Sequence, residues 1–132
     1  MPKIFGTERV CEAIGRWSPS DLAFITEFHY SQELDGKWSI LITCLFQNSE
    51  NHTSWPSVDD DFCHVQIHFS RVSNFNIKNV TSNPIQITGF DIIDISIDGC
   101  ENTNFSIVDY ENERISFFCE NVRIYSINGD IV

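Results

Sequence analysis

Residue types that bind metal ions gather most closely at Cys63, His64 and His68, which follow the carboxylates of residues 59–61. On a strand, His64 and His68 share a face but lie about 13 Å apart, at roughly 3.3 Å per residue. Cys63 points to the other face. One ion of ordinary geometry cannot reach both imidazoles across that distance. We therefore expect a solvated polar strand face here, with no metal and no other cofactor.

A nucleophilic cysteine needs an exposed, electropositive position. Cys100 beside Gly99 is the best candidate, but its acidic neighbours Asp98 and Glu101 disfavour the thiolate. The five cysteines are odd in number and widely spaced, which predicts buried thiols in a reducing compartment and no disulfide framework. The sequence has no phosphate-binding glycine loop, G-x-S-x-G elbow or H-E-x-x-H motif. Among so many acidic residues no carboxylate pair stands out, and we expect no enzyme.

Charge is the most distinctive property of the chain. Its 132 residues carry 8 Lys+Arg against 19 Asp+Glu, a formal net charge of −11. Nucleic acid and anionic membranes both need a basic footprint, so neither is an expected partner. No Lys or Arg lies between Asn79 and Glu113, a span with seven acidic residues, or between Lys37 and Arg71. We expect these acids on the outer face and loops of a sheet, where they serve either solubility or docking to a basic protein.

Alternating apolar and polar residues predict the strands that position these acids. Three trios are expected to face a core: 65/67/69, 93/95/97 and 115/117/119. Residues 38–46 are apolar on both faces, which predicts a central strand. The apolar pattern changes face at Gly89, which predicts a bulge or a bend. Residues 105–110 and 114–119 are expected to form one hairpin, and Glu120-Asn121 a second one leading to residues 122–127.

The N-terminal third gives mixed signals. Thr7 is a candidate cap for a short helix through Ile14, with Gly15 at its end. Ser18-Pro19 is typical of a helix start, yet residues 22–30 keep the parity of a strand. The strand is favoured, and the helix stays open as an alternative. The start of the chain has no apolar stretch of signal-peptide length and no run long enough to span a membrane, so we expect a cytoplasmic protein.

Together these features predict one domain over residues 1–132. The expected fold is β-rich α+β: a single antiparallel sheet or a flattened sandwich, meander-like, with one or two short N-terminal helices.

The second half also resembles a known group of proteins. The features are residues 85–92 with Gly89-Phe90, residues 105–111 with Asp109-Tyr110-Glu111, and residues 115–120 with their Phe-x-Cys strand. Their order is similar to that of small immunity proteins from bacterial polymorphic and contact-dependent growth inhibition toxin systems. The resemblance implies a cytoplasmic, single-domain protein that binds one toxin domain, frequently a nuclease with a basic cleft. It identifies no functional residue.

The sequence therefore predicts an immunity protein that neutralises a cognate basic toxin domain through an acidic surface. The alternatives are a small hydrolase or lyase that uses carboxylates, and a structural or assembly subunit. The oligomeric state stays open. Aromatic residues in loops are added as anchors because interface hot spots favour Tyr and Trp. For Trp55, next to Pro56, packing into the edge of the core stays open as an equal alternative. The predicted partner-binding residues are Trp55, Asp59, Asp60, Asp61, Asp94, Asp98, Glu101, Tyr110, Glu111 and Glu113.

Overall fold

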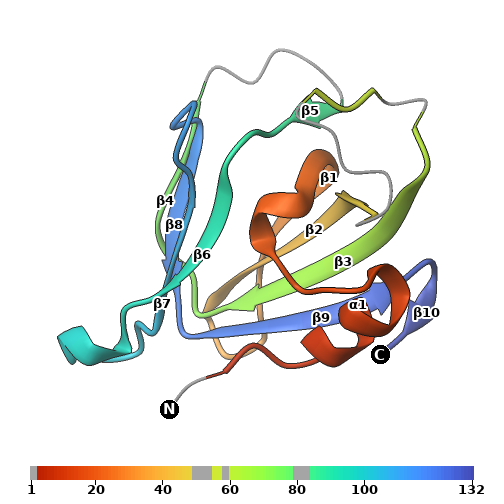
Figure 1. Cartoon of the computed structure of the whole chain (residues 1–132). Helices are drawn as coiled ribbons and strands as arrows, with labels where there is room; N and C mark the ends of the chain where they lie inside the picture. The colour runs from red at the N-terminus through yellow and green to blue at the C-terminus, as the bar shows by residue number, and fades with distance from the viewer. Residues whose placement is uncertain (1–2, 49–54, 58–59, 79–83) are drawn as a thin grey trace.

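The computed structural model describes residues 3–48, 55–57, 60–78 and 84–132 (Figure 1). It is β-rich, with one N-terminal α-helix and two antiparallel sheets. The six-stranded sheet has the order β10-β9-β3-β2-β1-β5, formed by β1 (Leu22–Gln32), β2 (Trp38–Gln47), β3 (Phe62–Ser70), β5 (Ile85–Gln86), β9 (Asn121–Ile127) and β10 (Asp130–Ile131). The four-stranded sheet has the order β4-β8-β7-β6, formed by β4 (Ser73–Ile77), β6 (Phe90–Asp94), β7 (Phe105–Asp109) and β8 (Ile115–Cys119). The expected β-rich α+β class is confirmed.

The core lies between the two sheets, and strand alternation supplies it. The inward trios 65/67/69 on β3 and 115/117/119 on β8 are buried as predicted. The ring of Phe69 meets that of Phe117 edge-on, with centroids 5.1 Å apart, and so joins the sheets directly. Strand β2 lies between β1 and β3, as its two apolar faces predict. On the face of β2 that points away from the main core, Leu45 is buried with Phe24.

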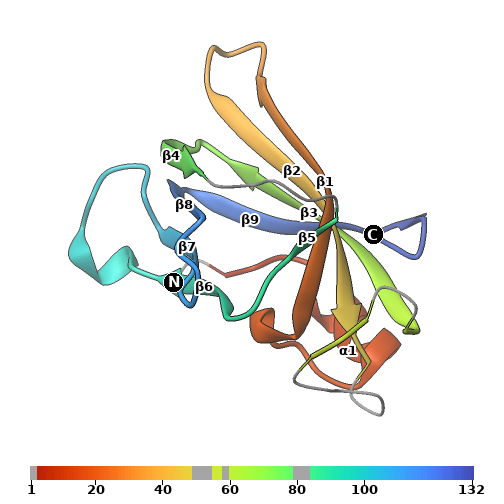
Figure 2. The ribbon, with the colours of Figure 1, turned by 90° about the horizontal axis from the view of Figure 1, so that it is seen from above.

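Gly89 marks the passage of the chain from one sheet to the other. Strand β5 pairs with β1, whereas β6 pairs with β7 (Figures 1 and 2). Gly89 between them has a φ of +83°, a conformation that an L side chain strains. The predicted bend is therefore confirmed, and it is a change of sheet.

The predicted strand through Ile93, Ile95 and Ile97 is wrong. Strand β6 ends at Asp94, and a short 3-10 helix, η2 (Ser96–Asp98), follows it. The Asp94 carboxylate accepts a hydrogen bond from the backbone N–H of Ser96 over 2.9 Å, a turn that ends the strand. The bend at Gly89 also resets the parity, so Phe90 takes the buried position. Ile97 consequently lies 93% exposed.

The predicted hairpin at Glu120-Asn121 is also wrong, whereas the β7–β8 hairpin is confirmed. Strand β9 leaves the sheet of β8 and pairs with β3. Glu120 binds the chain to the end of β3 at the point where it passes between the sheets. Its backbone N–H donates to the carbonyl of Ser70 over 3.0 Å, and its carboxylate lies 3.1 Å from Arg71 Nε. Alternation predicts which face of a strand is buried, but it does not predict the neighbouring strand.

The favoured strand in the N-terminal segment is confirmed, because β1 covers Leu22–Gln32. Helix α1 (Thr7–Ile14) ends before Gly15 as predicted, but it begins at Thr7 itself, and its N-cap is Gly6. A 3-10 helix, η1 (Pro19–Asp21), starts after Ser18 and leads directly into β1. No helix in the described ranges is long and apolar enough to cross a membrane.

The five cysteines, all within the described residues, are free thiols. Cys44, Cys63 and Cys119 are buried, whereas Cys11 and Cys100 are exposed, so the prediction of buried thiols is wrong for these two. Cys11 lies on the solvent side of α1, whose buried residues are Val10 and Ile14. Burial disfavours the thiolate and raises the pKa of Cys119 to about 12.

Candidate functional site

Both predicted aromatic anchors line one open groove together with Glu111. The Trp55 side chain is 81% exposed and that of Tyr110 is 54% exposed. The groove has a volume of about 350 Å³, and Leu22, Pro56 and Ile87 add apolar surface to its lining. We call it the Trp55–Tyr110 groove. The sequence proposed both rings as anchors, and the fold brings them to the same place from distant segments.

Gly89 positions the Tyr110 wall of the groove. A Cβ atom at residue 89 would lie 2.7 Å from Tyr110 Cε2 and 2.9 Å from Glu111 Cγ, which is too close for either side chain to stay in place. The backbone N–H of Tyr110 donates to the carbonyl of Gly89 over 3.0 Å. The tyrosine therefore rests directly on the bend that links the two sheets.

Asp109 stabilises the β7–β8 turn through its buried carboxylate. This turn carries Tyr110, Glu111 and Glu113. The Asp109 carboxylate is fully buried and accepts a hydrogen bond from the Ile115 N–H over 2.9 Å. Arg114 Nε lies 3.8 Å from Asp109 Oδ2, and the guanidinium also donates to the Gln86 carbonyl. Arg114 thus ties the turn to β5 as well as to the buried charge.

Asp109 corrects the expectation that the acids of residues 79–113 all lie on the outer surface. It follows Phe105 and Ile107 on the inward face of β7, so strand parity was the signal that would have placed it. Its charge is balanced inside the molecule by Arg114.

The predicted acids of the four-stranded sheet divide between its two ends. Glu111 and Glu113 lie in the β7–β8 turn, whereas Asp94, Asp98 and Glu101 lie where β6 ends and before β7 begins. Phe90 pairs with Asp109 at one end of these five-residue strands, and Asp94 with Phe105 at the other. The ends are about 13 Å apart at roughly 3.3 Å per residue. Figures 1 and 2 show the η2 segment projecting away from the sheets, so these acids do not form one patch.

Asp94 serves a local turn as well as the surface. The hydroxyl and the backbone N–H of Ser96 donate to its carboxylate and lower its pKa. The Asp94 carboxylate is therefore charged, and its hydrogen bonds come from Ser96 at the start of η2.

Asp60 and Asp61, which precede β3 and follow Trp55 in the sequence, are exposed. Asp60 accepts a hydrogen bond from the Ser57 N–H over 2.8 Å and returns one from its own N–H to the Ser57 carbonyl. Asp61 is exposed at the start of β3. Asp59 lies outside the described residues. The Pro56 carbonyl accepts a bond from Gln86 Nε2 over 3.4 Å, which connects this segment to β5.

Among the described residues, four basic side chains are paired with carboxylates that the sequence did not place in the site. These pairs are Arg16–Asp21, Lys37–Asp35, Arg71–Glu120 and Arg114–Asp109. Both fully buried carboxylates, Asp21 and Asp109, belong to this set, and neither lines the Trp55–Tyr110 groove. Within the described residues these four cations are thus paired inside the fold, one of them, Arg114, directly at the β7–β8 turn.

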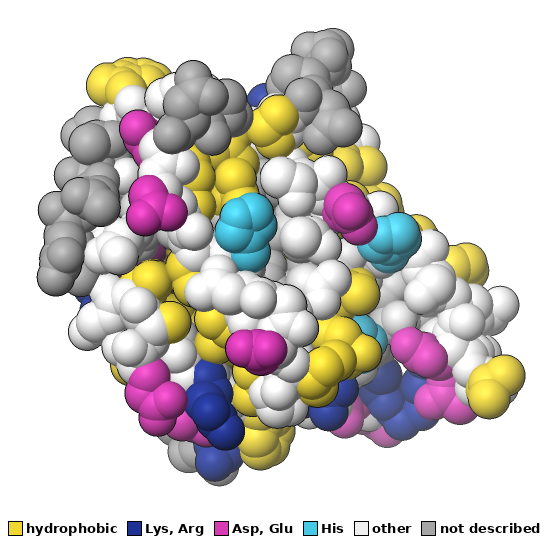
Figure 3. Space-filling model, turned by 90° about the vertical axis from the view of Figure 1, so that its right-hand side faces the viewer, with side chains coloured by type: hydrophobic (Ala, Val, Ile, Leu, Met, Phe, Trp, Pro, Cys, Tyr) yellow, Lys and Arg dark blue, Asp and Glu magenta, His cyan; other side chains and the backbone are white. Residues whose placement is uncertain are grey.

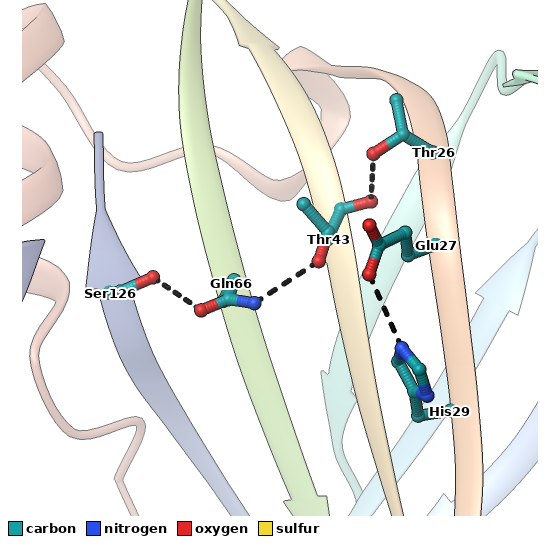
Figure 4. A network of polar contacts seen from close by, with 6 residues as sticks. All are labelled: Thr26, Glu27, His29, Thr43, Gln66 and Ser126. Carbon is teal, nitrogen blue, oxygen red and sulfur yellow. Dashed lines mark hydrogen bonds and ion pairs between the residues drawn. The ribbon is translucent and has the colours of Figure 1, made fainter. Parts of the chain in front are cut away.

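The outer face of the six-stranded sheet is largely polar beyond the Phe24–Leu45 cluster and carries the described histidines, His29, His64 and His68. Figure 3 shows histidine side chains among uncharged polar groups, with most of the visible Lys and Arg along the lower edge. A hydrogen-bond chain crosses the sheet from Ser126 through Gln66 to Thr43 (Figure 4). His29 bonds Glu27 over 3.2 Å on the same face. Within the described residues no three His, Cys, Asp or Glu side chains form a group that could hold a metal ion.

Comparison with known proteins found no matching family model, no matching curated protein and no matching solved structure.

Proposed function

We propose that this protein is an immunity protein: it binds a basic toxin domain stoichiometrically and covers the cationic site of that domain. The observation that carries the proposal is the Trp55–Tyr110 groove, where two exposed aromatic side chains lie beside Glu111. Exposed Trp and Tyr side chains are the residues that most often dominate the binding energy of protein interfaces.

The charge distribution supports a basic protein as the partner. The net charge is −11, and four of the basic side chains are paired with carboxylates within the described part of the fold. An excess of carboxylates accelerates encounter with a cationic surface and repels nucleic acid, which would compete for that surface. The groove then supplies the short-range contacts that steering alone does not give.

Protection from the toxin is the direct test. We expect co-expression of this chain with the toxin domain from a neighbouring gene to restore growth, and the two proteins to purify as a complex. Reversing Glu111 and Glu113 to Lys should slow association severalfold at low salt, because Glu111 lines the groove and Glu113 lies in the same β7–β8 turn. Reversing Asp98 and Glu101 to Lys is the matched control, since it changes the net charge equally at the far end of the sheet. If the wild-type chain gives neither protection nor a complex, the proposal is wrong.

A further inference from the structure

We propose that the Trp55–Tyr110 groove receives an arginine side chain of the partner, an inference that rests on the proposed function and specifies its central contact. The occupant is a single guanidinium group with its aliphatic stem, presented on the surface of a basic protein.

The aromatic side chains favour a planar cation. Trp55 and Tyr110 are both large and exposed, and neither belongs to the buried core. A guanidinium is flat, stacks on aromatic faces and is more weakly hydrated than an ammonium group, so it gains most from such a site. Glu111, in the same lining, supplies a carboxylate that can accept two parallel hydrogen bonds from the guanidinium.

The charge of the groove distinguishes it from two other hollows in the described part of the molecule. The hollow between α1 and β10 contains Arg9 and Glu12, and the one at the N-terminal segment contains Lys3 and Glu8, so both mix the two signs. Glu111 is the charged residue in the lining of the Trp55–Tyr110 groove, and no described Lys or Arg belongs to that lining. A cation is therefore complementary to this groove in particular.

Size and lining fit one side chain. A volume of about 350 Å³ lies at the small end of ligand sites, which span roughly 300–1,000 Å³. Leu22, Pro56 and Ile87 offer apolar contact to the methylene stem of an arginine, which long cationic side chains bury readily. Ser20 and Thr88 also belong to the lining, and their hydroxyls already bond Ser18 and Asn112.

Acetylated nona-arginine and nona-lysine peptides test the inference without the toxin. The two probes are titrated at low salt into the whole protein, while NMR follows the indole N–H of Trp55, assigned with the variant Trp55→Phe. We expect nona-arginine to move this resonance and to bind about fivefold more tightly than nona-lysine. The substitutions Tyr110→Ala and Glu111→Gln should each lower the affinity for nona-arginine by about fivefold. The matched control Glu101→Gln removes one negative charge near η2, and it should lower the affinity for nona-arginine less than about twofold.

Three results would overturn the inference: an unmoved Trp55 resonance, equal binding of the two peptides, or equal losses in Glu111→Gln and Glu101→Gln. Any of them would mean that net charge alone attracts the peptide. The proposed function would then still stand if the wild-type chain protects against the toxin. Conversely, failure of protection would overturn the proposed function whatever the peptides do.

Discussion

Replacing Gly89 by Ala tests how the bend between the sheets supports the Trp55–Tyr110 groove. The new Cβ would lie 2.7 Å from Tyr110 Cε2, so the tyrosine ring must leave its place. The φ of +83° adds strain of about 1–2 kcal/mol for a residue with a side chain. About half of the Tyr110 side chain is buried, and losing that contact costs about 1 kcal/mol more. The hydrogen bond from its N–H to the Gly89 carbonyl is worth about another 1 kcal/mol.

We therefore expect Gly89→Ala to lower the free energy of unfolding by about 3–4 kcal/mol. Gly36→Ala is the matched control, because Gly36 has the same φ of +83° but nothing within 4 Å of its Cβ position. It should cost only the backbone strain, about 1–2 kcal/mol. Urea unfolding followed by circular dichroism measures both values. Equal destabilisation in the two variants would refute the claim that Tyr110 rests on Gly89.

The remaining predictions concern buried groups. Arg114→Leu should destabilise the fold by about 3–5 kcal/mol, because it leaves the Asp109 carboxylate buried without its counter-charge. Asp109→Asn should cost less, about 1–3 kcal/mol, and a double variant less stable than Arg114→Leu alone would contradict the pairing. Iodoacetamide should alkylate Cys11 and Cys100 in the native protein while sparing Cys119 until urea is added, as mass spectrometry would show; early alkylation of Cys119 would contradict its burial. The unfolded state ionises this thiol near its ordinary pKa of 9.0, whereas the folded state does so only at about 12, so the free energy of unfolding should fall between these two pH values. Urea titrations across that range measure how the free energy of unfolding changes with pH. If this pH dependence is unchanged in a Cys119→Ala variant, it belongs to another group.

The strand pattern predicted much of the core. The trios on β3 and β8 are buried because a half-buried strand has a period of two, which is visible in the residues themselves. The trio from Ile93 to Ile97 has the same period but is not a strand throughout, because the Asp94–Ser96 turn and the bend at Gly89 override it. In the sequence, the Asp94–Ser96 pair is a weaker sign of a turn than three alternating isoleucines are of a strand.

The groove could be predicted only in part. The sequence offers Trp55 and Tyr110 as aromatic anchors in loops, but for Trp55 it allows packing at the core edge equally; in the structure both side chains are exposed. Their meeting depends on how β5 and the β7–β8 turn approach each other, which is a long-range property that neither segment encodes alone. The division of the acids between two ends of the sheet has the same origin. The burial of Asp109, in contrast, was already present in the alternation of β7.

The most direct test of the account is the association of this chain with the toxin domain, measured by biolayer interferometry at about 50 mM and about 500 mM NaCl. We expect a tight complex whose association rate falls steeply with salt, and a dissociation rate that rises at least tenfold in Tyr110→Ala at both salt concentrations. A complex that forms at the same rate at both salt concentrations and dissociates unchanged in Tyr110→Ala would contradict both the acidic steering and the groove.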